Sequence, residues 1–208
     1  MKLKNIISLF LVGLVLLTGC AEKPEVTVST YFDELKTSIS PDLKTIAIEK
    51  YFDQSLEFDN SNRDLSMDSF KSTEMSNRYL ELFRGFEYKI IDSTVKGDSA
   101  IVNVEITTYP VGDLLSNYMI QLFSKVFEWA FSGISEEEVT EKSISLFLDL
   151  ANDTEKTYIK TVPVYMVKKE GKWLISGDIT NYEMMDALTG GVLEFAKKLE
   201  ESTNQSNG

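Results

Sequence analysis

The alternation of apolar and polar residues between positions 86 and 109 constrains the fold more than any other feature of the chain. Apolar side chains occupy every second position on both sides of Gly97-Asp98, and they are Phe86, Tyr88, Ile90, Val102, Val104 and Ile106. A period of two around a turn signal is typical of a β-hairpin with one buried face. We therefore expect other parts of the chain to cover that face.

The register of this hairpin follows from the need to keep its apolar residues on one face. A two-residue turn would put the two apolar rows on opposite faces, whereas a three-residue loop at 97–99 sets Ile90 opposite Ile106. The same register places Asp92 against Val104, which predicts a bulge near Asp92.

A second hairpin is predicted over residues 157–176, where a β-rich run and a short apolar run flank the turn signal Glu170-Gly171. Its register sets Met166 opposite Ile175. Pro163 has no N–H group for the ladder, which indicates an edge position or a bulge.

Helical spacing of apolar residues predicts the remaining elements. The expected helices are 27–39, 41–51, 66–84, 113–132, 136–150 and 180–199. Ser66 and Asp113 are the expected N-caps of two of them, and Ser135 with Glu138 forms a capping box. Aromatic residues in 113–132 spread around more than one face, which predicts packing on both sides. The last helix has a weak point at residues 189–191, Thr-Gly-Gly.

The first 20 residues have the order of a signal peptide. Lys2 and Lys4 provide a positive start, and the apolar run 6–17 is too short to span a bilayer. The run closes in four residues that resemble the lipobox of bacterial lipoproteins, namely Leu17, Thr18, Gly19 and Cys20. The resemblance implies that Cys20 receives a diacylglyceryl group and becomes the first residue. An ordinary secretory signal with a chance cysteine is the alternative.

These patterns together predict an α+β fold. N-terminal helices would pack on a mostly antiparallel sheet of about four strands made of two β-hairpins, with a helical excursion between the hairpins and a C-terminal helix. The expected boundaries are a signal peptide at 1–19, a lipidated tether at 20–26, a single domain at 27–201 and a disordered tail at 202–208.

The chain is acidic, with a formal charge of −12 from 21 basic and 33 acidic residues. Removal of residues 1–19 would take away two lysines and no acidic residue, and the charge would become −14. Nucleic acid and anionic lipid headgroups repel such a chain, so no nucleic-acid partner is expected. Fatty acyl chains such as palmitate on Cys20 would hold the protein on the outer face of the cytoplasmic membrane, or in an outer-membrane leaflet where one exists.

Few groups are available for catalysis or metal binding. The chain has no histidine and one cysteine, which removes histidine-based triads, the usual zinc ligands and disulfides. The loop 57–64 superficially resembles a calcium loop, but Ser61 and Arg63 stand where acidic or amide ligands belong. The three glutamates at 136–138 point in different directions on a helix and are interpreted as capping residues. We expect no cofactor, no metal site and no catalytic residue.

Several stretches resemble small lipoproteins of low-GC Gram-positive bacteria (Firmicutes), which form a family of unknown function similar to NTF2-like proteins. The stretches are the lipobox, the strand 100–108, Phe131-Ser132-Gly133 with the glutamates at 136–138, the turn region 167–173, and residues 186–191. The resemblance implies an NTF2-like or cystatin-like body with a pocket. The possible lining of that pocket is Tyr88, Tyr109, Tyr165 and Trp173.

Three functions remain open at this point. The first is a non-catalytic binding module that presents a groove to an envelope protein or peptide. The second is a carrier of a small apolar ligand in an NTF2-like pocket, which the 23 aromatic residues favour. The third is an enzyme that would use Asp92 with tyrosines, by analogy with NTF2-like isomerases. Aromatic residues on an alternating strand are far more often core, so we expect no enzyme.

The lipid anchor gives a direct prediction. In a Cys20→Ala variant, or in cells treated with the signal-peptidase inhibitor globomycin, the processed and lipidated form should be lost, because the acylated thiol is the anchor. Membrane and medium fractions compared by immunoblot would measure this. Equal membrane retention of the variant and the unchanged protein would contradict the anchor.

Overall fold

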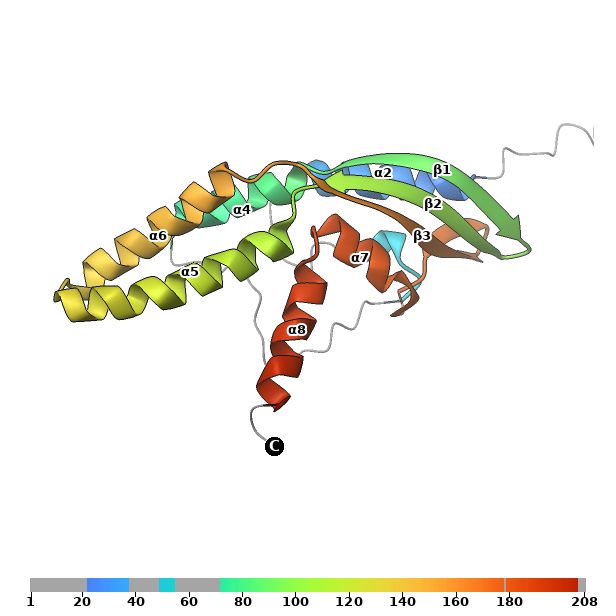
Figure 1. Cartoon of the computed structure of the whole chain (residues 1–208). Coiled ribbons are helices and arrows are strands. Elements are labelled where there is room, and N and C mark those ends of the chain that lie inside the picture. The colour runs from blue at the N-terminus through green and yellow to red at the C-terminus, as the bar shows by residue number, and fades with distance from the viewer. Residues whose placement is uncertain (1–21, 38–48, 55–71, 178, 206–208) are drawn as a thin grey trace, which may run out of the picture.

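The computed structural model describes residues 22–37, 49–54, 72–177 and 179–205. Within them the fold is α+β, with helices around an open antiparallel sheet of four strands (Figure 1). The helices are α2 (Pro24–Thr37), α4 (Thr73–Arg84), α5 (Val111–Ser132), α6 (Glu136–Asn152), α7 (Tyr182–Leu188) and α8 (Val192–Gln205). The strands are β1 (Glu87–Lys96), β2 (Ser99–Thr108), β3 (Tyr158–Lys169) and β4 (Lys172–Ile175). Two short 3-10 helices are η1 (Glu49–Tyr51) and η3 (Ile179–Asn181). The predicted α+β class and both hairpins are confirmed.

One face of the sheet forms the main core. The strands lie in the order β1-β2-β3-β4, and every second residue of β2 from Ala100 to Thr108 is buried. These residues pack against the apolar stripe of α2 and against α7. The helical spacing of apolar residues predicted from position 27 is confirmed as far as Leu35, because Val28, Tyr31, Phe32 and Leu35 are all fully buried.

The register of the first hairpin differs from the prediction, because Ile90 lies opposite Val104 rather than Ile106, and Asp92 lies opposite Asn103 rather than Val104. Gly97 and Asp98 alone form the turn, with Lys96 opposite Ser99, so the expected three-residue loop is wrong. The predicted bulge is confirmed between Ile90 and Asp92. One extra residue in β1 shifts the register by one position, which has the same effect on the faces as a longer loop.

The second hairpin has the predicted register, with Met166 opposite Ile175. Glu170 and Gly171 both adopt positive φ angles, 51° and 83°, as a two-residue hairpin turn requires. Lys168 donates to the carbonyl of Asp98 across the β2–β3 ladder, and hydrogen-bonded pairs alternate with non-bonded ones. Pro163 therefore lies at a position that makes no hydrogen bond to β2. Its nitrogen points to the β4 side of β3, at a point beyond the end of β4, since the pairing with β4 ends at Met166. The predicted edge position is confirmed.

Both ends of the described chain are more helical than expected. α2 begins at Pro24, so positions 24–26 of the predicted tether belong to a helix. The single helix predicted over 180–199 is two helices, because Gly190 and Gly191 take positive φ angles of 66° and 86° and break it. α8 then continues to Gln205, so positions 202–205 of the predicted tail are helical.

The caps are partly as predicted. Ser135 and Glu138 form the expected capping box, with both reciprocal hydrogen bonds present. Pro110, not Asp113, occupies the N-cap position of α5. Ser72 caps α4 through its hydroxyl, which accepts from the N–H of Met75. The expected cap Ser66 lies outside the described residues, as do the signal peptide, the lipobox with Cys20, most of the predicted helix 41–51, and the loop 57–64.

The core packing predicts a large difference between two phenylalanines. Phe32→Ala should lower the free energy of unfolding by about 3–5 kcal/mol, because its fully buried ring contacts Phe86 and Tyr88 edge-on. Phe131→Ala, the same substitution at a residue that is 90% exposed, should change it by less than about 0.5 kcal/mol. Urea denaturation followed by circular dichroism measures both. Similar losses for the two variants would contradict the described core.

Candidate functional site

α5 and α6 form an antiparallel helical hairpin, here named the arm, that extends from one end of the sheet (Figure 1). Its base is fixed by a second buried cluster. The cluster comprises Met75, Leu82, Val111, Leu114, Phe147, Ala151 and Val192. Tyr118 of α5 packs edge-on against Phe147 of α6, with ring centres 5.5 Å apart. The arm is thus firmly held where it joins the body.

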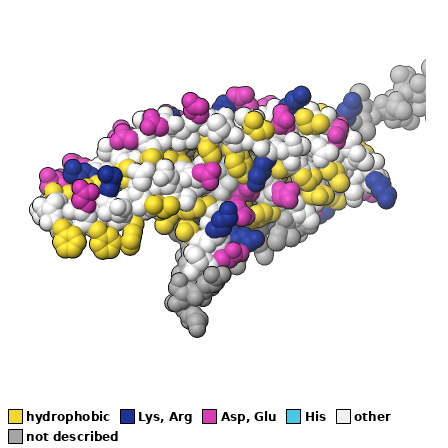
Figure 2. Space-filling view, viewed as in Figure 1, with side chains coloured by type: hydrophobic (Ala, Val, Ile, Leu, Met, Phe, Trp, Pro, Cys, Tyr) yellow, Lys and Arg dark blue, Asp and Glu magenta, His cyan; other side chains and the backbone are white. Residues whose placement is uncertain are grey.

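The outer half of the arm exposes a row of large apolar side chains. We name this row the arm stripe, and its members are Ile120 (68% exposed), Phe123 (71%), Phe127 (55%) and Phe131 (90%). Their spacing places them on one face of α5, and Met119 and Val126 are also exposed beside it. Figure 2 shows hydrophobic side chains along the lower edge of the arm, where they project near its tip. The predicted packing of this excursion on both sides is wrong for its outer half, because α6 covers only one side of α5.

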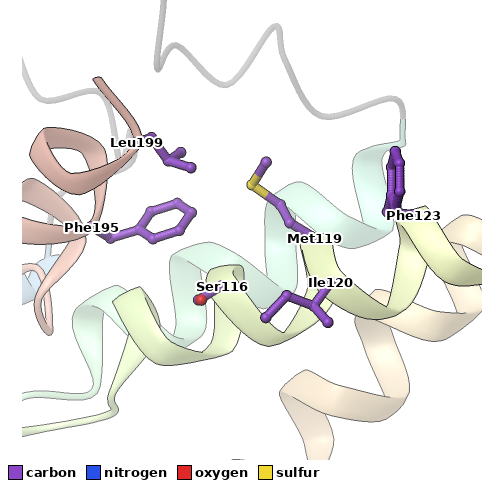
Figure 3. Close-up of a pocket in the computed structure, with 6 residues that line it drawn as sticks. All are labelled: Ser116, Met119, Ile120, Phe123, Phe195 and Leu199. Atoms are coloured by element: carbon purple, nitrogen blue, oxygen red, sulfur yellow. The ribbon is translucent and has the colours of Figure 1, made fainter. Parts of the chain in front are cut away.

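A groove lies between the inner part of the stripe and α8. Its volume is about 400 Å³, and its lining consists of Ser116, Met119, Ile120, Phe123, Phe195 and Leu199. Figure 3 shows Phe195 and Leu199 on the α8 side, facing Met119 on α5. The groove and the arm stripe together are named the docking surface. Five of the six lining residues are apolar, so the groove suits an apolar occupant.

Glycines set the close crossing of α5 and α8 at the apex of this groove. The N–H of Gly112 donates to the carbonyl of Gly190 at 2.9 Å. A Cβ atom on Gly112 would overlap the carbonyl oxygen of Gly191, so this position requires glycine. From this contact the two helices diverge (Figure 1), which opens the groove between them.

The four residues predicted to line a pocket are not brought together. The hydroxyl of Tyr88 donates to the Asp33 carboxylate at 2.9 Å and to the Ser29 carbonyl at 3.2 Å. Partial burial and the neighbouring Asp33 carboxylate raise the pKa of Tyr88 to about 12. Trp173 is buried in the core, and its carbonyl accepts from the hydroxyl of Thr27. These two residues hold α2 on the sheet.

The other two lie elsewhere. Tyr109 packs against the buried cluster at the base of the arm, with the Lys156 ammonium 5.7 Å from its ring centre. The backbone N–H and carbonyl of Tyr165 are both bonded by the side-chain amide of Asn181. Asp92, the candidate carboxylate, is exposed and accepts from the amide of Asn103 at 2.7 Å.

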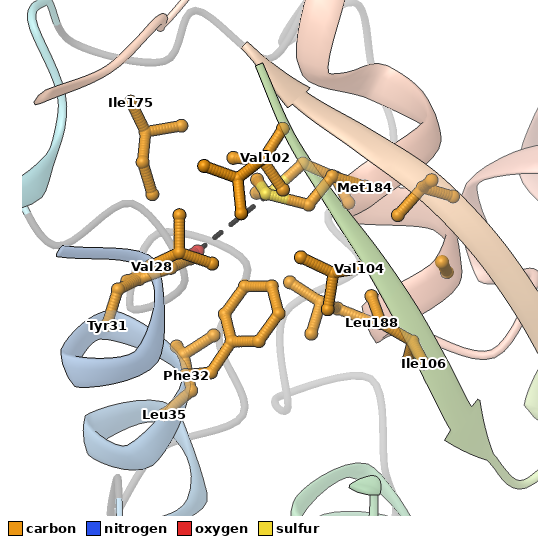
Figure 4. Close-up of a cluster of buried hydrophobic side chains, with 14 of the residues drawn as sticks. Val28, Tyr31, Phe32, Leu35, Val102, Val104, Ile106, Ile175, Met184 and Leu188 are labelled. Atoms are coloured by element: carbon orange, nitrogen blue, oxygen red, sulfur yellow. Dashed lines mark hydrogen bonds between the residues drawn. The ribbon is translucent and has the colours of Figure 1, made fainter. Parts of the chain in front are cut away.

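The space expected to hold an NTF2-like pocket contains packed side chains. Between the sheet and α2, the side chains of Val28 and Phe32 meet Val102 and Val104 (Figure 4). Met184 and Leu188 of α7 complete the contact from the other side of the cluster. This region is a core.

A second hollow of about 410 Å³ lies beside α7 and α8. Its lining is Tyr165, Thr180, Tyr182, Glu183 and Lys197. Burial raises the pKa of Tyr182, and its phenol oxygen is enclosed without a hydrogen-bond partner among the described residues. Opposite charges on Glu183 and Lys197 give this hollow no clear preference for an anion or a cation.

A buried carboxylate joins β3, α7 and α8. Asp186 is 2% exposed and accepts hydrogen bonds from the Tyr158 hydroxyl (3.0 Å), the Lys160 ammonium (3.0 Å) and the backbone N–H of Glu194 (2.9 Å). Burial alone would lower the pKa of Lys160, but hydrogen bonds with Tyr158 and Asp186 raise it well above its usual value. The contact with Glu194 satisfies a free donor at the start of α8.

Sequence reasoning missed this network and the exposure of the arm stripe. The stretch 186–191, which contains Asp186, was noted in the sequence only as part of a family resemblance. In the described part of the chain, no group of three or more acidic, histidine or cysteine side chains is placed to hold a metal ion. Among the described helices, none combines the length and the apolar character needed to cross a membrane.

Comparisons with known proteins found little similarity. No protein-family model matches the chain, and no curated protein matches it. One solved structure that is similar is a candidate lipoprotein, YcdA, from Bacillus subtilis subsp. subtilis str. 168, with a TM-score of 0.40 and 16% sequence identity. The similarity covers 58% of this chain and 39% of YcdA, so this chain spans less than half the length of that protein. The NTF2-like assignment and the lipid anchor therefore remain predictions.

The Asp186 network predicts a stability effect. Asp186→Ala should lower the free energy of unfolding by about 2–4 kcal/mol, because three donors lose a buried acceptor. Asp92→Ala, at an exposed aspartate with one side-chain partner, should cost less than about 1 kcal/mol. Urea unfolding of both variants tests the difference, and equal midpoints would show that Asp186 does not organise this region.

Proposed function

We propose that the protein is a lipid-anchored, extracytoplasmic and non-catalytic binding module, and that the docking surface on α5 and α8 receives an apolar segment of an envelope protein. The observation that carries this proposal is the arm stripe. Four large apolar residues that are more than half exposed lie on one face of a projecting helix. Contiguous apolar patches of this kind mark interaction sites in soluble domains.

The size of the stripe supports binding on energetic grounds. At about 200 Å² per side chain, Phe123, Phe127 and Phe131 together expose roughly 400 Å². Covering that area would contribute about 10 kcal/mol at about 25 cal/mol per Å². Association costs about 4–15 kcal/mol, so burial of the three rings offsets much of that cost, and a partner that also covers Met119 and Ile120 offsets more of it.

The direction of the arm supports an anchored role. The carboxylate of Glu25, at the start of α2, accepts from the Ser93 hydroxyl near the tip of the first hairpin. Lys36, at the end of α2, lies 5.5 Å from the ring centre of Phe86, at the other end of the sheet. The arm leaves β2 at that same end. An anchor at Cys20 would therefore hold one end of the sheet near the membrane.

The lengths of the elements give the reach of such an arrangement. β2 has 10 residues and α5 has 22, so each spans roughly 33 Å. With its anchor at the far end of the sheet, the protein would carry the stripe tens of ångströms along its long axis from the point of attachment (Figure 1). This arrangement favours a partner in the envelope over the bilayer that holds the anchor.

A carrier of a small apolar ligand is the second candidate function. The groove of about 400 Å³ falls within the usual range of ligand sites, about 300–1,000 Å³. A small ligand there would leave Phe127 and Phe131 in water, because neither lines the groove. A polypeptide segment accounts for more of the exposed surface. Native mass spectrometry of the purified protein with a bound apolar molecule would favour the carrier.

Site-specific photo-crosslinking tests the binding module. Phe127→p-benzoylphenylalanine in the anchored protein should give a discrete crosslink to one envelope protein in intact cells, because Phe127 lies at the centre of the stripe. Ile159→p-benzoylphenylalanine is the matched control, since Ile159 is 61% exposed but lies on β3, outside the arm stripe and the groove. The crosslink should disappear when Ile120→Ser and Phe123→Ser are introduced together.

Three results would overturn the proposal. The first is the absence of a crosslink at position 127. The second is an equal pattern of crosslinks at positions 127 and 159. The third is a crosslink at 127 that survives loss of the neighbouring stripe residues.

A further inference from the structure

We infer that the occupant of the docking surface is a cationic amphipathic helix. This inference rests on the proposed function and specifies the chemistry of the partner. It draws on three observations, namely the shape of the groove, the charge of the arm and the placement of the lysines around it.

The shape fits a helix. The groove has one wall from α5 and one from α8, and two diverging helices can receive the apolar face of a third. From Ile120 to Phe131 the stripe extends about 17 Å, at about 1.5 Å per residue. A partner helix of about three turns would match this length. Its apolar residues would recur at every third or fourth position, as in the stripe itself.

The negative charge of the arm favours a positively charged partner. Residues 111–152 contain seven acidic and two basic side chains, which gives the arm a formal charge of −5. Glu128 on α5, and Glu136 and Glu137 at the tip, are exposed close to the outer end of the stripe. Lysine or arginine residues beside the apolar face of a partner would meet these carboxylates.

The basic residues near the surface do not cancel this charge. Lys125 lies about 200° around α5 from Phe123, on the side away from the stripe. Lys197 is likewise about 200° from Phe195 and lines the second hollow. Lys198 is paired with Glu194 at 3.7 Å. Around the stripe, the carboxylates are therefore in excess.

The same charges disfavour the other occupants. A second copy of the chain would bring two arms of charge −5 together, on molecules that each carry −14 without residues 1–19. An anionic bilayer would also be repelled. Helices that lie in a membrane interface are rich in lysine and arginine on their polar face, whereas α5 has one lysine and no arginine in 22 residues.

The test uses the full-length lipidated protein with Phe127→p-benzoylphenylalanine, held in nanodiscs of zwitterionic phosphatidylcholine. Three synthetic 18-residue peptides serve as probes: an amphipathic leucine–lysine helix, the same pattern with glutamate for lysine, and a scrambled leucine–lysine peptide without an apolar face. The amphipathic basic peptide should crosslink about tenfold more than either of the others. Its advantage should shrink at high salt and with Glu128→Gln, Glu136→Gln and Glu137→Gln together. Glu138 stays unchanged because it belongs to the capping box.

The outcomes separate this inference from the proposed function. Equal crosslinking of the acidic peptide, or of the scrambled one, overturns the cationic helix. Crosslinks mainly between two copies of the protein, or none to any peptide, overturn it as well. In each of these cases, a crosslink at position 127 in intact cells that depends on the stripe would still support the proposed binding module. Loss of that cellular crosslink is the separate result that removes the proposed function.

Discussion

The close contact of Gly112 with Gly190 and Gly191 determines how the helical part of the molecule is arranged on the sheet. It lets two backbones approach to hydrogen-bond distance, which no side chain at position 112 would permit. The contact fixes the start of the arm and the start of α8 at one point. Asp186, a few residues earlier, secures the same turn from the sheet side. The docking surface therefore depends on residues that lie outside it.

The parts of the fold that the sequence predicted are those that local pattern determines. Alternation in β2 and helical spacing in α2 identify the buried faces, because each pattern concerns one element. The alternation alone could not distinguish a bulge in β1 from a longer turn, since one extra residue at Ile91 or in the turn places the apolar residues of both strands on one face. The Asp186 network joins residues 26 and 28 positions apart, so no local pattern contains it. Periodicity also predicts an apolar face without showing what covers it, which is why the exposure of Phe123 and Phe127 was missed.

The candidate site was predicted less well than the fold for a related reason. Aromatic residues were assigned to a pocket because of a resemblance, but Tyr88 and Trp173 have structural tasks instead. Tyr88 fixes α2 through Asp33, and Trp173 fills the core beneath it. The surface with the strongest case for function is instead an apolar face of α5 whose residues were interpreted as ordinary core. Burial, which depends on tertiary packing, distinguishes the two cases.

Pro163 would have a consequence for a protein that the predicted anchor held at high local density on a membrane. The outer side of β3 is open beyond Met166 in the described part of the fold, and unpaired strands of that kind recruit strands from neighbouring molecules. The proline removes one donor from that edge, and Asn181 occupies the backbone of Tyr165 beside it. Both features would make this edge a poorer template for strands of neighbouring molecules.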